Sequence, residues 1–109
     1  MKVIKRRYLA VSIDSDGTLD SRDFMDAVWS AITRLFGEYG ASKTGLSLIH
    51  YDPTKRLAIL RTGHTTLEMV RTALASINKT GTKPVALHVL AVSGTIKALQ
   101  ERIDEHPHF

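Results

Sequence analysis

Two short apolar stretches in the middle of the chain constrain its fold more than any other feature. Residues 46–51 and 57–62 are both rich in aliphatic side chains, and the turn-forming sequence Asp52-Pro53-Thr54-Lys55 separates them. Two such runs joined by so short a connection predict a β-hairpin, whose strands must be antiparallel. The chain therefore has to build a sheet that contains an antiparallel pair.

Helical and strand-like patterns flank this hairpin on both sides. Alternating apolar and polar residues predict a strand at 7–13, and apolar positions spaced by three and four predict a helix from residue 21. After the hairpin, Thr65 and Glu68 match a capping box, and a second helical pattern follows through Ile77. The remaining patterns are a buried strand at 85–92 and an amphipathic helix at 93–103. The predicted order is β-α-β-β-α-β with an additional C-terminal helix.

This order predicts an α+β fold of the ferredoxin-like, split βαβ kind, with two helices on one face of a four-stranded antiparallel sheet. A chain of 109 residues is the size of one domain, so residues 1–109 form a single ferredoxin-like domain in this interpretation. We expect residues 1–5 and 104–109 to be flexible. Because both faces of the predicted sheet carry aliphatic residues, the last helix, a second copy or a partner should cover the second face.

Charge is unevenly distributed around a net value of +4. Residues 1–13 hold four basic and no acidic side chains, whereas residues 14–38 hold six acidic and two basic ones. Such a division favours one basic surface and one acidic surface, with a polyanion as partner for the basic one. The acidic segment would repel RNA, so we expect it to face solvent or a protein.

Basic side chains suited to phosphate contacts occur at several predicted strand ends. They are Lys5, Arg6 and Arg7 before the first strand, Lys55 and Arg56 at the hairpin tip, and Arg61 on the second hairpin strand. A further candidate, Lys97, follows Ser93-Gly94-Thr95 at the start of the last helix. That triplet could hold a phosphate on helix N–H groups, but we favour a simple cap.

The sequence Asp14-Ser15-Asp16-Gly17-Thr18 resembles the first motif of haloacid dehalogenase-type phosphotransferases, in which a carboxylate attacks phosphorus. A small magnesium-dependent phosphohydrolase using Asp14 and Asp16 is therefore an alternative function. The later acidic pair that this chemistry needs is missing, and the hairpin predicts an antiparallel sheet where that fold requires a parallel one. A third hypothesis is a dimeric ferredoxin-like ligand sensor whose apolar sheet face forms the dimer contact.

The absence of cysteine excludes disulfides and thiolate metal sites. The apolar run after the first basic residues is too short to span a membrane, so we expect a cytoplasmic protein without membrane association. We predict no catalytic residue and no metal ligand in this chain.

Four blocks of sequence resemble the small ribonuclease P subunits known as protein component 2, whose eukaryotic counterpart is shared by ribonucleases P and MRP. The blocks are residues 5–9, 36–40, 57–61 and 93–100, and the similarity extends from about residue 5 to residue 103. It is the order and spacing of the blocks together that carry the resemblance.

The resemblance implies a subunit that breaks no bonds itself. In this family the catalytic RNA, with magnesium, removes the 5′ leader from precursor tRNA, and the small subunit pairs with a TIM-barrel protein in a heterotetramer that contains two small subunits. It implies that this chain binds no cofactor and that Lys5, Arg6, Arg7 and Arg61, with Lys97, contact the RNA. Gly37, Tyr39 and Gly40, in the predicted loop before the hairpin, would belong to a protein interface for self-association.

Overall fold

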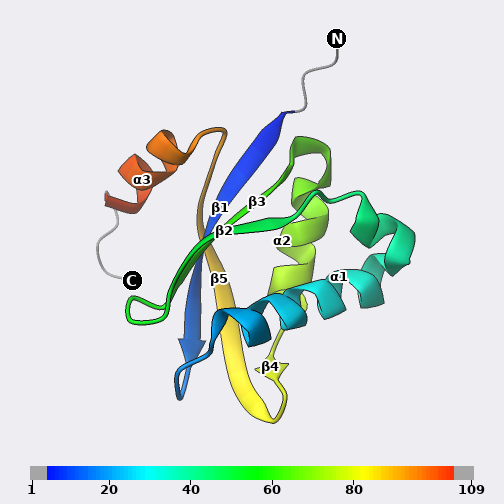
Figure 1. Ribbon diagram of the computed structural model, residues 1–109, viewed down its shortest axis with the longest axis vertical. Coiled ribbons are helices and arrows are strands. Elements are labelled where there is room, and N and C mark those ends of the chain that lie inside the picture. The colour runs from blue at the N-terminus through cyan, green and yellow to red at the C-terminus, as the bar shows by residue number, and fades with distance from the viewer. Residues whose placement is uncertain (1–4, 105–109) are drawn as a thin grey trace.

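The computed structural model describes residues 5–104, which form one antiparallel sheet with helices on both of its faces (Figure 1). In chain order the elements are β1 (Arg6–Ser15), α1 (Ser21–Ser42), β2 (Ser47–Asp52), β3 (Leu57–Gly63), the 3₁₀ turn η1 (His64–Thr66), α2 (Leu67–Ser76), β4 (Lys79–Thr80), β5 (Lys83–Ser93) and α3 (Ile96–Asp104). The expected flexibility of the two ends concerns residues that lie outside the described range, except for Lys5 and Asp104.

Strand β1 occupies the centre of the sheet, whose order is β2-β3-β1-β5-β4. All neighbouring strands are antiparallel, and the predicted hairpin of β2 and β3 is confirmed by their pairing. The sheet has five strands where the sequence predicted four. The additional strand, β4, is two residues long and turns into β5 at Gly81, which adopts a left-handed backbone conformation.

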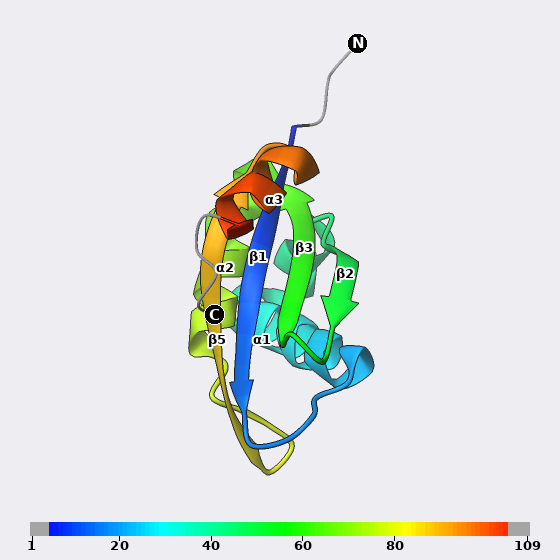
Figure 2. The ribbon, with the colours of Figure 1, turned by 90° about the vertical axis from the view of Figure 1, so that its left-hand side faces the viewer.

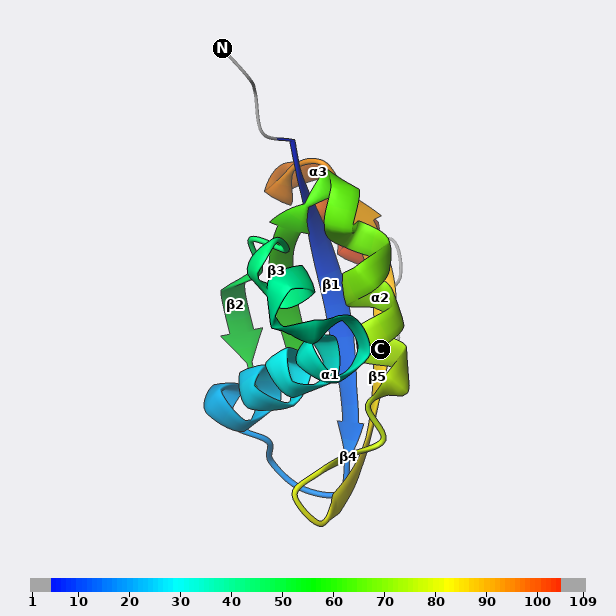
Figure 3. The same cartoon turned by 90° about the vertical axis from the view of Figure 1, so that its right-hand side faces the viewer.

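Helices α1 and α2 pack side by side on one face of the sheet, as Figure 3 shows. The buried side chains of α1 in this core are Phe24, Val28, Ala31 and Ile32, and Ala41 beyond the break at Gly37. Asp20 caps the helix because its Oδ1 accepts a hydrogen bond of 2.8 Å from the backbone N–H of Asp23. The apolar spacing in the sequence therefore placed the buried face of α1 correctly as far as Ile32, whereas Leu35 and Phe36, which continue the same pattern, are exposed.

Helix α3 lies across the opposite face of the sheet (Figure 2). Its buried residue Leu99 packs with Ala10 of β1 and Ile59 of β3, which form a second, smaller core. The last helix thus provides a cover for the second apolar face, one of the three covers expected from the sequence. It also occupies surface that a dimeric ligand sensor would have used for its dimer contact.

Two local predictions were wrong. The segment from Gly37 to Ser42 was predicted as loop, but α1 continues through it after a break at Gly37, whose φ of 76° and ψ of 170° are not helical. The capping box of Thr65 and Glu68 is also not formed, because one 3₁₀ turn precedes α2 and no side chain caps that helix. The neighbouring Thr66 instead directs its hydroxyl to the carbonyl oxygens of Gly63 and Thr44.

No helix within residues 5–104 combines the length and the apolar character needed to span a bilayer.

Candidate nucleic-acid interface

Five of the predicted RNA contacts gather where β1 begins. Arg6 and Arg7 open this central strand opposite Gly63 and Thr62, and Arg61 lies beside Tyr8 one step further along the β1–β3 pair. The carbonyl oxygen of Lys5 accepts a hydrogen bond from the backbone N–H of His64, which fixes the entry of the chain into the sheet. The basic end, as we name the group Lys5, Arg6, Arg7, Arg61 and Lys97, therefore draws on three separate segments.

The turn between β5 and α3 joins the basic end from the other side of β1. Tyr8 pairs with Ser93, and a Cβ placed on Gly94 would lie 3.6 Å from Nη1 of Arg7. Lys97 is exposed in the first turn of α3. Guanidinium and ammonium groups close to one another around a turn can contact successive phosphates of an RNA backbone.

Arg61 carries an unsatisfied donor at this end of the sheet. Its Nε atom is buried and, within the described residues, makes no hydrogen bond. A buried donor without a partner is costly, since nearly all such groups in folded proteins are paired. An RNA phosphate or base edge reaching the Arg61 guanidinium would compensate for that cost.

The start of α3 is a cap, as favoured from the sequence. The hydroxyl of Thr95 accepts a hydrogen bond of 3.1 Å from the N–H of Ala98, and the hydroxyl of Ser93 accepts one of 3.2 Å from the N–H of Thr95. These side chains satisfy donors that a phosphate would otherwise have to bind. Lys97 is consequently the group at this helix that remains available to an anion.

Lys55 and Arg56 lie at the other end of the β1–β3 pair, roughly 17 to 20 Å from Arg61 at the usual rise per strand residue. Arg56 has a left-handed backbone with φ of 54°, its carbonyl oxygen accepts from the N–H of Ile13, and its guanidinium donates to the carbonyl oxygen of Ser15. These contacts fasten the hairpin tip to the end of β1. Lys55 and Arg56 are therefore separated from the other predicted RNA contacts. Arg56 also stabilises the fold, through its hydrogen bonds with Ser15 and Ile13.

The predicted protein interface coincides with an exposed apolar patch at the break in α1. Leu35, Phe36 and Tyr39 are 43%, 37% and 74% exposed, and the Lys43 ammonium lies 4.5 Å from the centre of the Tyr39 ring. Gly40 packs tightly, since a Cβ there would come within 2.9 Å of Cβ of Phe36. Large exposed apolar side chains that cluster in this way are typical of protein contact surfaces.

The phosphohydrolase alternative finds no support in the geometry. Asp14 and Asp16 are exposed, and β1 is antiparallel to both of its neighbours. In the described part of the chain, no three side chains of histidine, aspartate or glutamate come together in a way that could hold a metal ion. These two carboxylates therefore lack the surroundings that nucleophilic phosphoryl transfer requires.

The chain is similar to known proteins over most of its length. The model of the Rpp14/Pop5 family matches residues 7–104. The chain belongs to the Rpp14/Pop5 family. Ribonuclease P protein component 2 of Pyrococcus horikoshii is 32% identical over 98 residues, which cover 90% of this chain and 82% of that protein. The protein of the same name from Methanococcus aeolicus is 33% identical over 104 residues, covering 95% of this chain and 76% of the relative.

One solved structure contains a chain with a similar fold. A chain in the cryo-EM structure of yeast ribonuclease MRP superimposes with a TM-score of 0.72 and covers 98% of this chain and 95% of its own length. At 16% identity the likeness concerns the fold.

The sequence did not indicate that one basic side chain, Arg102, joins α3 to the sheet. Arg102, near the end of α3, donates from Nη1 to the carbonyl oxygen of Val92 and so ties the helix to β5. A basic residue in the last turn of a helix is common because it opposes the helix dipole, so the sequence offered no sign of a longer-range contact. This bond holds α3 to β5 in addition to the packing of Leu99.

Proposed function

We propose that this chain is a noncatalytic protein subunit of ribonuclease P, and that it supports the catalytic RNA in removing the 5′ leader from precursor tRNA. The observation that carries the proposal is membership of the Rpp14/Pop5 family over residues 7–104, together with relatives named ribonuclease P protein component 2. It functions in tRNA processing within a ribonucleoprotein endoribonuclease.

The basic end is the RNA contact surface in this proposal. Lys5, Arg6, Arg7 and Lys97 supply positive charge around one end of β1, and Arg61 contributes a donor that has no partner within the described residues. The contact is one of phosphates and shape, because among the aromatic residues only Tyr8 lies on the central strand beside these groups. Lys55 and Arg56 would make a second, smaller contact at the hairpin tip.

We further propose that the fold is a ferredoxin-like variant. Helix α1 connects β1 to β2 with β3 between them, and α2 lies on the connection from β3 to β5 with β1 between them. Both connections have the split βαβ arrangement, which supports the assignment. The two-residue β4 and helix α3 are additions to it.

The protein partners in this proposal are a TIM-barrel subunit of ribonuclease P and a second copy of this chain, joined in a heterotetramer. The exposed side chains of Leu35, Phe36 and Tyr39 next to Gly37 and Gly40 support self-association at the break in α1. We place the particle in the cytoplasm and assign magnesium to the RNA. No step of the reaction is assigned to a metal on this chain.

Reconstituted cleavage of precursor tRNA tests the proposed function. The RNA and the TIM-barrel subunit are assayed with and without this chain across a magnesium titration, and the chain should lower the magnesium concentration needed for half-maximal cleavage. The matched control replaces it with the Arg6→Ala/Arg7→Ala variant, which should shift the requirement less. An identical magnesium dependence with and without the wild-type chain would contradict the proposal.

A further inference from the structure

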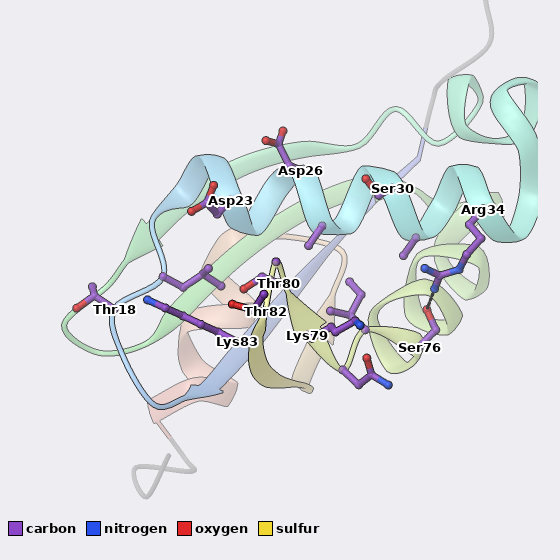
Figure 4. Close-up of a pocket in the computed structure, with 16 residues that line it drawn as sticks. Thr18, Asp23, Asp26, Ser30, Arg34, Ser76, Lys79, Thr80, Thr82 and Lys83 are labelled. Carbon is purple, nitrogen blue, oxygen red and sulfur yellow. Dashed lines mark hydrogen bonds between the residues drawn. The ribbon is translucent and has the colours of Figure 1, made fainter.

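A groove of about 610 Å³ separates helix α1 from the β4–β5 hairpin, on the side of the molecule away from α3 (Figure 4). Its floor includes the apolar side chains Leu19, Ala27, Ala31 and Ile77. At one end, Nη2 of Arg34 donates a hydrogen bond of 3.2 Å to Oγ of Ser76, which links α1 to the last residue of α2. The groove is thus bounded by well-defined elements and has an apolar base.

The two walls of the groove differ in charge, since α1 carries two carboxylates and one guanidinium and the β4–β5 segment carries two ammonium groups. Figure 4 shows Asp23 and Asp26 on α1, and Lys79 and Lys83 on the opposite segment. All four side chains are exposed, and no ion pair joins the walls within the described residues. A ligand that lies along the groove therefore meets the carboxylates of Asp23 and Asp26 on α1, with the Arg34 guanidinium at the Ser76 end, and ammonium groups on the other side.

The wall that contains β4 also offers backbone groups. Strand β4 is the last strand in the sheet order and pairs only with β5, through Lys79 with Pro84 and Thr80 with Lys83. Its outer edge consequently has no strand partner among residues 5–104. Such an edge accepts an extended polypeptide as an additional strand, with affinity from main-chain hydrogen bonds.

These observations favour one class of occupant. RNA is disfavoured because its phosphates would face Asp23 and Asp26, and a purely cationic segment is disfavoured by Lys79 and Lys83. An extended polypeptide supplies both charges, backbone donors and acceptors for β4, and apolar side chains for the floor. We propose that the groove is the docking site for an extended segment of a protein partner that directs a basic side chain to α1 and an acidic one to the β4–β5 hairpin.

The test uses the TIM-barrel ribonuclease P subunit from the same source as the probe, so the choice of probe rests on the proposed function. Its dissociation constant with the full chain is measured by calorimetry without RNA. Asp23→Asn/Asp26→Asn on one wall and Lys79→Gln/Lys83→Gln on the other should each weaken the complex about five- to tenfold, as expected for two rim charges. The control Asp14→Asn/Asp16→Asn removes the same charge from the same acidic segment outside the groove and should leave the constant within about twofold.

RNA affinity, measured in parallel by filter binding, should be the same for wild type and all three variants. Partner affinity that is unchanged in both groove variants overturns the docking site, and if the reconstituted enzyme still shows its lowered magnesium requirement, the proposed function stands without it. Absence of a complex with the wild-type chain also overturns the docking proposal. Loss of RNA affinity in the groove variants, with partner affinity intact, would assign the groove to RNA and overturn it as well.

Discussion

The phenol of Tyr51 on edge strand β2 donates a hydrogen bond to the backbone carbonyl oxygen of Leu19, thirty-two residues earlier in the chain. Leu19 lies in the connection between β1 and α1, so the bond holds that connection against the sheet. The Phe24 ring packs beside the phenol with ring centres 5.6 Å apart. Burial, followed by the negative charges of Asp20 and Asp23, raises the pKa of Tyr51 above its ordinary value of 10.0.

Tyr51→Phe should lower the free energy of unfolding at neutral pH by about 1 kcal/mol, the usual net value of one hydrogen bond. Urea denaturation measures the change. The control is Tyr39→Phe, because the Tyr39 side chain is exposed and its hydroxyl makes no hydrogen bond within the described residues. Equal losses in the two variants would contradict a role for the Tyr51–Leu19 bond.

The raised pKa of Tyr51 predicts that the protein loses stability at alkaline pH. Because the pKa of Tyr51 is raised in the folded protein, the unfolded chain loses this proton first as the pH rises past about 10, and the free energy of unfolding then falls with pH. Denaturation midpoints followed from pH 9 to pH 11 should decline less steeply in Tyr51→Phe than in the wild type. Parallel declines would show that other groups control this range.

Gly37→Ala should reduce the free energy of unfolding by about 1 to 3 kcal/mol, the usual cost of a side chain held in a backbone region that only glycine populates readily. The cause is the φ of 76° and ψ of 170° at the break in α1, where no neighbouring atom would hinder the added Cβ. Gly17→Ala is the control, since an added Cβ there meets only the flexible end of Lys83 at 3.8 Å. A Gly37→Ala variant as stable as Gly17→Ala would mean that the break can straighten at little cost.

This glycine also shows what the sequence could and could not indicate. The spacing of Phe24, Val28 and Ile32 gave the start and buried face of α1, because burial imposes that period directly. The glycines after Leu35 predicted a loop, whereas the chain breaks at one residue and resumes the helix. A single non-helical residue leaves no periodic signal, so the sequence did not indicate that the helix resumes after Gly37 and continues to Ser42.

Arg56→Ala should be less stable than Arg56→Gly by about 1 kcal/mol, the usual penalty of a side chain in the left-handed region. Both variants lose the hydrogen bond from the guanidinium to Ser15, but only glycine relieves the φ of 54°. Comparison of the two variants by urea denaturation isolates the backbone effect. Identical stabilities would rule out strain at this position.

Arg6→Ala/Arg7→Ala should weaken binding to the ribonuclease P RNA and flatten its dependence on salt. Each lost phosphate contact reduces the slope of log affinity against log salt concentration by about 0.7 to 0.9. Filter binding over a range of potassium chloride concentrations measures the slope. The control Arg71→Ala removes an exposed cation from α2, where it pairs with Glu68, and should leave the slope unchanged.

The position of the basic end could be predicted from sequence only in pieces. Arg6 and Arg7 stood out as a basic cluster before a strand, and Arg61 as a charge on the hairpin, but their proximity depends on the pairing of β1 with β3. The groove was not predicted at all. Lys79 belongs to a two-residue strand that is too short to leave an alternating pattern, Lys83 is the first residue of β5, and the aspartates resembled ordinary charges at the start of a helix.

The central place of β1 has a consequence for how the basic end forms. Strand β1 has no partner until the chain has supplied β3 and then β5. Ser93 of β5 pairs with Tyr8 of β1, although most of the sequence lies between them. Contacts of such separation close slowly, because a long loop must be ordered before they form. Fragments that lack either half of the chain should therefore show no RNA affinity of their own, and the basic end comes into existence only with the completed fold.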